Sequence, residues 1–193
     1  MPPDDRSTRA PQLLALLAAV RVLVFAALDR RPMFGLAEAA DLQRSMFYHY
    51  GLRGHLDWTF LEQVTRDGFK PPLWYGGIPL LFAWKDTLRL ADYLVVHAGF
   101  AAILVLLAAA LGRQIGGRPG AIVAAALAAA LPGIAGGVTR IGVEPLHPVL
   151  LLALLVRVGV LLRDAHRGTA LPRSALALGA VLGLGLLAKW NFA

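Results

Sequence analysis

The chain has 193 residues, of which 58% are hydrophobic and only 16% charged, and its mean hydropathy is +0.62. Soluble domains are nearer half apolar and a quarter charged, so this composition indicates an integral membrane protein. The formal net charge is +7, but the basic residues stand between apolar runs rather than in patches with aromatics, which argues against nucleic-acid binding. The chain has no cysteine, which excludes disulfides, thiolate metal sites and cysteine nucleophiles.

The first apolar run covers residues 11–28, long enough to cross a hydrocarbon core of about 30 Å at about 1.5 Å per residue. A signal peptide is the alternative, because the run follows arginines near the N-terminus. However, Asp4 and Asp5 weaken a signal-peptide N-region, and Arg21 interrupts the apolar stretch. We therefore expect an uncleaved transmembrane helix, in which the sequence names no partner for the charge of Arg21.

Residues 29–89 separate this run from the next one, and we expect them to lie outside the membrane. Up to residue 70 the segment is too charged to enter lipid, whereas residues 71–84 are apolar but too short to span comfortably. We interpret residues 71–84 as an interfacial or re-entrant helix. Three of its aromatic residues are of the kind that prefers the membrane–water boundary, namely Trp74, Tyr75 and Trp84.

Further apolar runs predict transmembrane helices at about residues 90–111, 119–136, 145–162 and 174–188. Pro119 suits the first turn of the second of these, and Pro132 is expected to end it. Abundant alanine and glycine would let the helices approach closely. The predicted fold class is an all-α integral membrane protein, one domain over residues 1–193 with about five transmembrane helices and an extracytoplasmic loop that carries interfacial helices.

Basic residues in the short connections set the predicted orientation. The N-terminal tail and the connections near residues 112–118 and 163–173 fall on one side of a five-span protein and carry several arginines. The opposite short connection, near residues 137–146, holds only Arg140. The positive-inside rule therefore puts the N-terminus in the cytoplasm and the long loop outside. We predict a multi-pass protein of the plasma (inner) membrane.

Five features follow one another along the chain. Asp41 lies in EAADLQRSMFYHYGL, and Lys70 lies in FKPPLWYGGIPLLFAW. A glycine–basic turn, GRQIGGRPG, joins two apolar runs; TRIGVEPLHPVLLLALL contains Arg140 and Glu144; and GLGLLAKWNFA contains Lys189. In this order they resemble the N-terminal part of a GT-C glycosyltransferase, the class that includes dolichyl-phosphate-mannose-type mannosyltransferases and lipid A aminoarabinose transferases. The resemblance covers nearly all of this chain but only about the first half of a family member.

The resemblance implies a polytopic enzyme that transfers a sugar from a polyprenyl-phosphate donor to a lipid, glycan or protein acceptor outside the membrane. Such a transfer needs a carboxylate to orient or deprotonate the attacking hydroxyl. It also needs cationic side chains to hold the carrier phosphate and offset its developing charge. By resemblance, Asp41 is the general base and Glu144 the second acidic position. Lys70, Arg140 and Lys189 are implied ligands of the carrier phosphate.

Structural roles are open for the same residues. Asp41 lacks the acidic neighbour that relatives often have, so Glu38 is a rival for its role, and a solvated loop carboxylate is the simpler reading. Glu144 can instead stabilise the start of a helix through the helix dipole. Lys70 and Lys189 can anchor their segments at the lipid headgroups.

The histidines give no metal signature, and no cofactor is assigned. His147 follows Glu144 by three residues, which would put both on one helical face. A divalent ion is left open there, because some relatives use one.

Ala193 ends this sequence where relatives continue through further helices and often a soluble domain. We expect the N-terminal portion of an enzyme, which alone can be inactive, or a chain whose partner supplies the missing half. A small non-enzymatic membrane protein, such as a transporter subunit or assembly partner, is the alternative. Replacing Asp41 by Asn would discriminate, because only an enzyme should lose sugar transfer.

Overall fold

The computed structural model describes residues 6–28, 36–54, 72–131, 146–168 and 171–188. Every regular element in these ranges is an α-helix. The elements are α1 (Arg6–Leu28), α2 (Leu36–Leu52), α4 (Pro72–Leu81), α5 (Leu90–Ala130), α7 (Leu146–Arg167) and α8 (Leu171–Ala188). The prediction of an all-α chain is therefore confirmed for this part of the protein.

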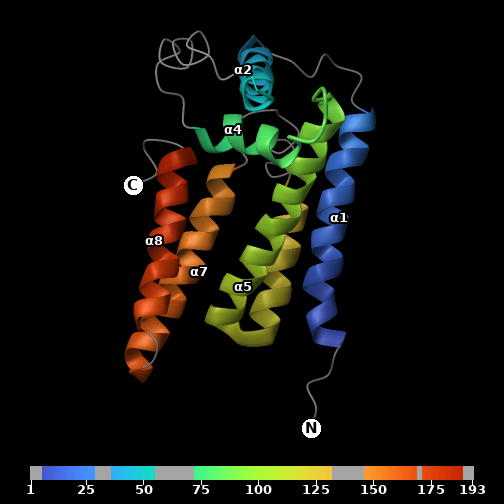
Figure 1. Ribbon diagram of the computed structural model, residues 1–193. Coiled ribbons are helices and arrows are strands. Elements are labelled where there is room, and N and C mark those ends of the chain that lie inside the picture. The colour runs from blue at the N-terminus through green and yellow to red at the C-terminus, as the bar shows by residue number, and fades with distance from the viewer. Residues whose placement is uncertain (1–5, 29–35, 55–71, 132–145, 169–170, 189–193) are drawn as a thin grey trace.

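The long helices stand side by side, and two small helices lie at one end of them (Figure 1). α1 packs against α5, α5 against α7, and α7 against α8. α4 crosses the ends of the long helices and also contacts α8, while α2 packs on α4. We call the end that carries α2 and α4 the upper end, and the opposite end the lower end.

Two of the helices, α5 and α7, are long and apolar enough to cross a membrane. The 22 residues of α7 span about 33 Å at about 1.5 Å per residue, close to the thickness of a hydrocarbon core. α8 has a shorter apolar stretch, Pro172–Ala188. The runs predicted at 11–28, 90–111 and 174–188 fall within α1, α5 and α8, whereas those at 119–136 and 145–162 extend beyond the ends of α5 and α7 into residues outside the described ranges.

α5 combines two of the predicted runs in one hairpin. Its backbone leaves helical geometry at Gly116 and at Gly117, where φ is +61°, a conformation that glycine adopts without strain. The chain reverses there, so that the arm of residues 90–115 descends and the arm of residues 118–130 returns (Figure 1). Pro119 lies in the first turn of the second arm, and that arm ends at Ala130, before Pro132, as predicted.

Small residues let the two arms touch. A Cβ atom on Gly112 would meet the backbone carbonyl of Gly120 and would approach the Cβ of Ala124 to 2.7 Å. The main buried cluster continues this pattern upward, because it consists largely of alanine. Its members include Ala15, Ala18 and Val22 of α1, and Ala101, Val105, Ala108, Ala121, Ala125 and Ala128 of α5. Close backbone packing, rather than large side chains, holds this part of the bundle together.

Arg21 lies within this alanine-rich packing, and the structure supplies a partner that the sequence could not name. Its Nη1 donates a hydrogen bond of 3.0 Å to the carbonyl oxygen of Ala129. Ala129 is in the last turn of α5, where carbonyls have no partner within the helix. A cation at a helix C-terminus also interacts favourably with the helix dipole. The charge is thus accommodated by an unsatisfied helix end.

A second buried cluster joins the helix ends at the top of the bundle. It brings Trp74, Tyr75 and Ile78 of α4 against Leu88 and Tyr93 at the start of α5, Leu146 and Leu150 at the start of α7, and Ala188 at the end of α8. Trp74 and Tyr75 are only 1% and 2% exposed, so they are core residues of this chain. Their side chains therefore face the protein interior, and the expected place of their helix at the membrane boundary stays a prediction. Trp84, at 76% exposed, remains available for that role.

Candidate functional site at the upper end

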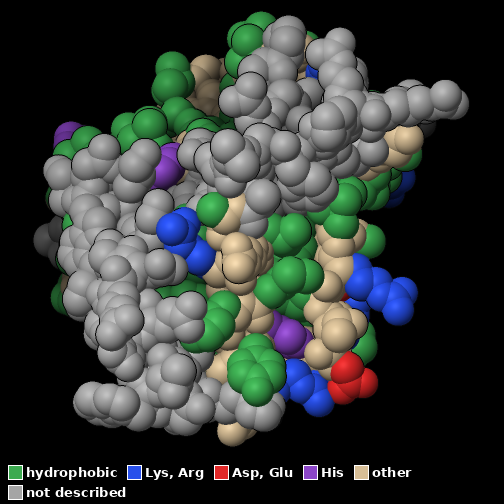
Figure 2. Space-filling view, turned by 90° about the horizontal axis from the view of Figure 1, so that it is seen from above, with side chains coloured by type: hydrophobic (Ala, Val, Ile, Leu, Met, Phe, Trp, Pro, Cys, Tyr) green, Lys and Arg blue, Asp and Glu red, His purple; other side chains and the backbone are tan. Residues whose placement is uncertain are grey.

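Polar side chains concentrate where α2, α4 and the start of α5 meet. Seen from above, this end shows histidine, basic and acidic side chains among hydrophobic ones (Figure 2). The described polar residues come from α2, from the connection between α4 and α5, and from the first turns of α5. They include Ser45, His49, Arg53, Lys85, Asp86, Arg89, Asp92 and His97. Several are buried, which requires that they be paired.

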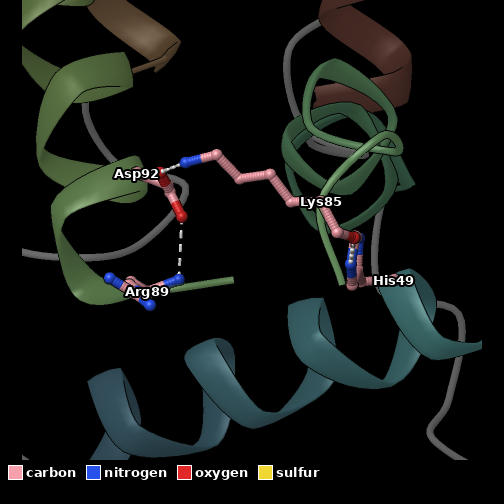
Figure 3. Close-up of polar contacts among 4 residues, drawn as sticks. All are labelled: His49, Lys85, Arg89 and Asp92. Carbon is pink, nitrogen blue, oxygen red and sulfur yellow. Dashed lines mark hydrogen bonds and ion pairs between the residues drawn. The ribbon is translucent and has the colours of Figure 1, made fainter. Parts of the chain in front are cut away.

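Asp92 is the centre of the charged contacts (Figure 3). It is buried in the first turn of α5 and forms an ion pair with the ammonium group of Lys85. Its second carboxylate oxygen accepts a hydrogen bond of 2.8 Å from the backbone N–H of Arg89, the N-cap residue. Arginine has no acceptor with which to cap a helix, so Asp92 caps this N-terminus from inside it. Negative charge is also favourable at this end of the helix dipole.

Lys85 links α2 to α5 through both its side chain and its backbone. While its ammonium pairs with Asp92, its carbonyl oxygen lies 2.9 Å from Nε2 of His49 and 2.7 Å from Nη1 of Arg53. A carbonyl only accepts, so His49 donates from Nε2. The Lys85 ammonium also lies 5.1 Å and 5.2 Å from the ring centroids of Phe82 and Trp84, within cation–π range. Its side chain is 28% exposed, so the cation retains access to solvent.

Aromatic rings form the floor below these charges. The ring centroid of Trp74 lies 5.1 Å from that of Tyr75, 5.9 Å from that of Tyr93 and 6.3 Å from that of His97. Such distances are typical of favourable aromatic pairs. Ser45 of α2, fully buried, donates a hydrogen bond of 3.3 Å to the carbonyl of Tyr75. The floor therefore fixes α2, α4 and α5 relative to one another.

Some buried polar atoms of this region have no hydrogen-bond partner among the described residues, including Nδ1 of His49 and Nε1 of Trp74. Unpaired buried polar groups are costly, and in native proteins they often mark functional positions. Because these atoms are buried they do not face solvent, whereas the Lys85 ammonium, on a side chain that is 28% exposed, can still contact an anionic group. The described residues contain no group of three or more His, Asp or Glu that could hold a metal ion.

The residues predicted from the sequence fall mostly outside the described ranges. Asp41 and Glu38 belong to α2, although their side chains are not among those described. Lys70, Arg140, Glu144 and Lys189 lie outside the described residues altogether. The described chain resumes or stops close to three of them in sequence, at Pro72, Leu146 and Ala188. The predicted pairing of Glu144 with His147 on one face likewise involves an undescribed residue and stays a prediction.

Comparison with known proteins adds no assignment. No protein-family model, curated protein or solved structure matches the chain. The resemblance described above therefore rests on the ordered sequence features alone, and function has to be argued from the chain's own residues.

Sequence reasoning missed the described members of this cluster. Lys85 and Asp92 are seven residues apart, but Lys85 precedes the helix that begins at Leu90, so helical periodicity does not predict their contact. One signal was present, because an acidic residue three positions after the last non-helical residue is typical of a helix N-terminus. His49 follows Ser45 by four residues, which places both on one face of α2. Their partners on α4 and after it could not be read from that spacing.

Proposed function

We propose that the chain is a five-span membrane protein and the N-terminal portion of a GT-C type glycosyltransferase. It transfers a sugar from a polyprenyl-phosphate donor to an extracytoplasmic acceptor, from the plasma (inner) membrane, with its N-terminus in the cytoplasm. Asp41 is the general base, with Glu144 as the second carboxylate. Lys70, Arg140 and Lys189 bind the carrier phosphate.

The apolar outer surface supports the membrane part of this proposal. Only 33% of the most apolar window of α5, and 17% of that of α7, is buried inside the protein. A core helix of a soluble protein would be mostly buried, so the apolar outer faces of these helices need another apolar environment. Lipid provides it. The arms of α5 together with α1, α7 and α8 supply five antiparallel segments for the five spans.

The meeting of helix ends at the top is the observation that carries the catalytic part. The starts of α4, α5 and α7 and the end of α8 share one buried cluster. In the sequence, Lys70 directly precedes the Pro71–Pro72 pair at α4, Glu144 comes two residues before α7, and Lys189 follows α8 at once. Asp41 is one helical turn before Ser45, whose hydroxyl bonds to α4. The described helix ends that share this cluster are therefore, in the sequence, the neighbours of two acids and two cations.

The proposed reaction is a simple displacement. The acceptor hydroxyl oxygen forms a bond to C1 of the sugar, and the bond between C1 and the phosphate oxygen breaks. The proton of the hydroxyl passes to the Asp41 carboxylate. The electron pair remains on the polyprenyl phosphate, whose increased negative charge is offset by the lysines and the arginine. Lys85, with its partly exposed ammonium, adds positive charge to the same end.

Single-cysteine labelling tests the membrane arrangement, and the absence of native cysteine makes it direct. Thr87→Cys puts a thiol at an exposed position of the upper end, and Ala165→Cys does so at the lower end. In intact cells, a membrane-impermeant maleimide should label the first variant and should label the second only after permeabilisation. Equal labelling of both in intact cells would contradict the proposed orientation and span number.

Replacement of Asp41 tests the catalytic proposal. Membranes containing the full native polypeptide are given polyprenyl-phosphate-mannose and polyprenyl-phosphate-aminoarabinose, and sugar transfer is measured. Asp41→Asn should reduce transfer by at least about a hundredfold, as is usual when a general base is lost. Asp86→Asn is the matched control, because Asp86 is a 90% exposed acid at the same end. Full transfer by Asp41→Asn, or equal losses in both variants, would overturn the assignment of Asp41.

A further inference from the structure

The lower end of the bundle has a groove between the α5 hairpin and α7. Its open cavity of about 550 Å³ falls within the range of about 300–1,000 Å³ that is usual for ligand clefts. Two arginines line it, Arg113 from the first arm of α5 and Arg163 from the last turns of α7. The described part of the protein gives neither arginine an acidic partner.

Apolar side chains form most of the remaining wall of this groove. Leu111 and Ile115 come from α5, and Leu155 and Leu162 come from α7. Ile115 and Leu162 are strongly exposed, so the groove opens onto an apolar surface rather than into the core. The two arginines therefore lie beside apolar side chains within one groove.

A hydrogen bond joins the two helices that line the groove. The side-chain amide of Gln114 donates a hydrogen bond of 3.1 Å to the carbonyl of Val156 on α7. Gly159 leaves the space that this amide occupies, because a Cβ there would collide with Gln114. This cross-link fixes the spacing of the two helices that supply Arg113 and Arg163.

Arg113 also lines a second, smaller groove of about 310 Å³ on the side of α1, which contains Arg118 and the apolar residues Pro11 and Leu106. Arg113 thus stands between two grooves of the same character. The described acidic side chain at this end, Asp164, is hydrogen-bonded to Ser174 and does not line either groove. The lower end is therefore strongly basic where it is also apolar.

We propose that the groove between α5 and α7 is a binding site for an anionic phospholipid. The lipid phosphate is held by the guanidinium groups of Arg113 and Arg163, whose planar donors match phosphate oxygens. The acyl chains lie along the leucine wall toward the middle of the bundle. Anionic headgroups bind in basic pockets between transmembrane helices by the same combination of charge and apolar contact. The proposal requires that the chain be inserted in a membrane, as proposed above, but not that it transfer sugar.

Binding of a fluorescent phosphatidylglycerol to the full chain in zwitterionic detergent micelles tests this site. Phosphatidylcholine with the same acyl chains is the zwitterionic comparison, and inorganic phosphate is a competitor without acyl chains. The ionic strength is about 0.15 M, which screens charges more than about 8 Å away. We expect phosphatidylglycerol to bind more tightly than phosphatidylcholine, and Arg113→Gln and Arg163→Gln to weaken it by roughly fivefold each.

Arg167→Gln is the matched control. It removes the same charge from the same end of α7, but Arg167 does not line the groove. Arg167 is one helical turn from Arg163, so a small electrostatic loss is expected, but it should be clearly smaller than the loss in Arg163→Gln because Arg167 makes no contact in the groove. An equal loss in Arg167→Gln and Arg163→Gln would mean that the lipid binds through the overall positive charge of this end rather than in the groove. Equal binding of the two lipids would also overturn the proposal. Displacement of the lipid by millimolar phosphate would identify a free-phosphate site instead.

Folding and insertion are checked separately, by helix content and by the maleimide labelling described above. The substituted arginines are exposed, so each single variant should fold. If the chain proves not to be inserted in a membrane, the membrane proposal fails. If it is inserted and shows no preference for phosphatidylglycerol, only the lipid site fails.

Discussion

The two ends of the bundle differ in whether their described charged side chains are paired. At the upper end, Lys85 pairs with Asp92 and Arg53 pairs with Asp86 at 2.8 Å, and helix α2 is held in place by contacts with these residues. At the lower end, Arg113 and Arg163 have no acidic partner in the described ranges and face open grooves. Paired charges fix a structure, whereas a cation left beside an apolar groove is available to a ligand. Among the described residues, paired charges therefore position the helices of the upper end, whereas the lower end presents arginines without acidic partners beside apolar grooves.

Trp74→Ala should have the largest effect, because it empties the aromatic floor on which the upper end rests. Truncating a buried tryptophan costs about 3–5 kcal/mol in the free energy of unfolding, measured here by titration with denaturing detergent. Trp84→Ala, at an exposed site in the same region, should change it by no more than about 1 kcal/mol, the usual value of an exposed cation–π contact such as that with Lys85. Trp74→Phe should cost much less than Trp74→Ala, since the indole N–H has no partner to lose. Similar values for Trp74→Ala and Trp84→Ala would refute the rigid upper end.

Lys85→Met tests whether the ion pair fixes this geometry. It leaves the buried Asp92 carboxylate with only the Arg89 N–H, and we expect a loss of about 2–3 kcal/mol. This loss in the free energy of unfolding should be smaller than the loss on breaking a fully buried ion pair, because Lys85 is partly exposed. Adding Asp92→Asn to Lys85→Met removes the unpaired charge and should recover at least about 1 kcal/mol in a double-mutant cycle. Strictly additive losses would mean that the pair does not stabilise the fold.

Gly112→Ala probes the lower end, where backbone proximity rather than pairing holds the helices. The new methyl group would meet the Gly120 carbonyl and Ala124, so the arms of α5 must separate. We expect a loss of about 1–3 kcal/mol, the usual cost of overpacking. The matched change Gly183→Ala in α8 meets nothing within 4 Å and should be neutral or stabilise by up to about 1 kcal/mol through helix propensity. Equal changes in the free energy of unfolding for the two variants would contradict the close packing of the two arms of α5.

Arg53→Gln should have the smallest effect, even though it breaks an ion pair at the upper end. The ion pair is open to solvent, because the side chain of Asp86 is 90% exposed and that of Arg53 is 36% exposed. Exposed pairs contribute about 0.2–1 kcal/mol, and salt reduces this further. The loss should therefore shrink when unfolding is repeated at about 1 M salt. A loss above about 2 kcal/mol would show that the hydrogen bond from Arg53 to the Lys85 carbonyl, rather than the ion pair, is the important contact.

The helices were the part of this molecule that the sequence could predict. Long apolar runs became α1, α5, α7 and α8, and proline positions correctly marked where the second arm of α5 begins and ends. The extent of α2 was not predicted, because its 17 residues mix charged, aromatic and apolar residues without a strong helical periodicity. Its position depends on contacts with α4, which begins 20 residues after α2 ends.

The candidate site was less accessible to sequence reasoning. Trp74 and Tyr75 look like boundary residues in isolation, yet they are buried because α2, α5 and α7 surround α4. Lys85 and Asp92 come together only because the connection after α4 folds back onto the start of α5. The roles of Asp41, Glu144, Lys70, Arg140 and Lys189 stay predictions, and Asp41→Asn remains their first test.

Several cross-links in this protein end on backbone carbonyls. Arg21 reaches the carbonyl of Ala129, Ser45 that of Tyr75, and His49 and Arg53 both reach that of Lys85. Because every residue type has this acceptor, residue 129 could change side chain while the contact persisted. Only the donor is under selection to keep its identity, so the two positions need not change together in evolution. Contact prediction from correlated substitutions would therefore be weakest at the very cross-links that join α1 to α5 and α2 to the rest of the upper end.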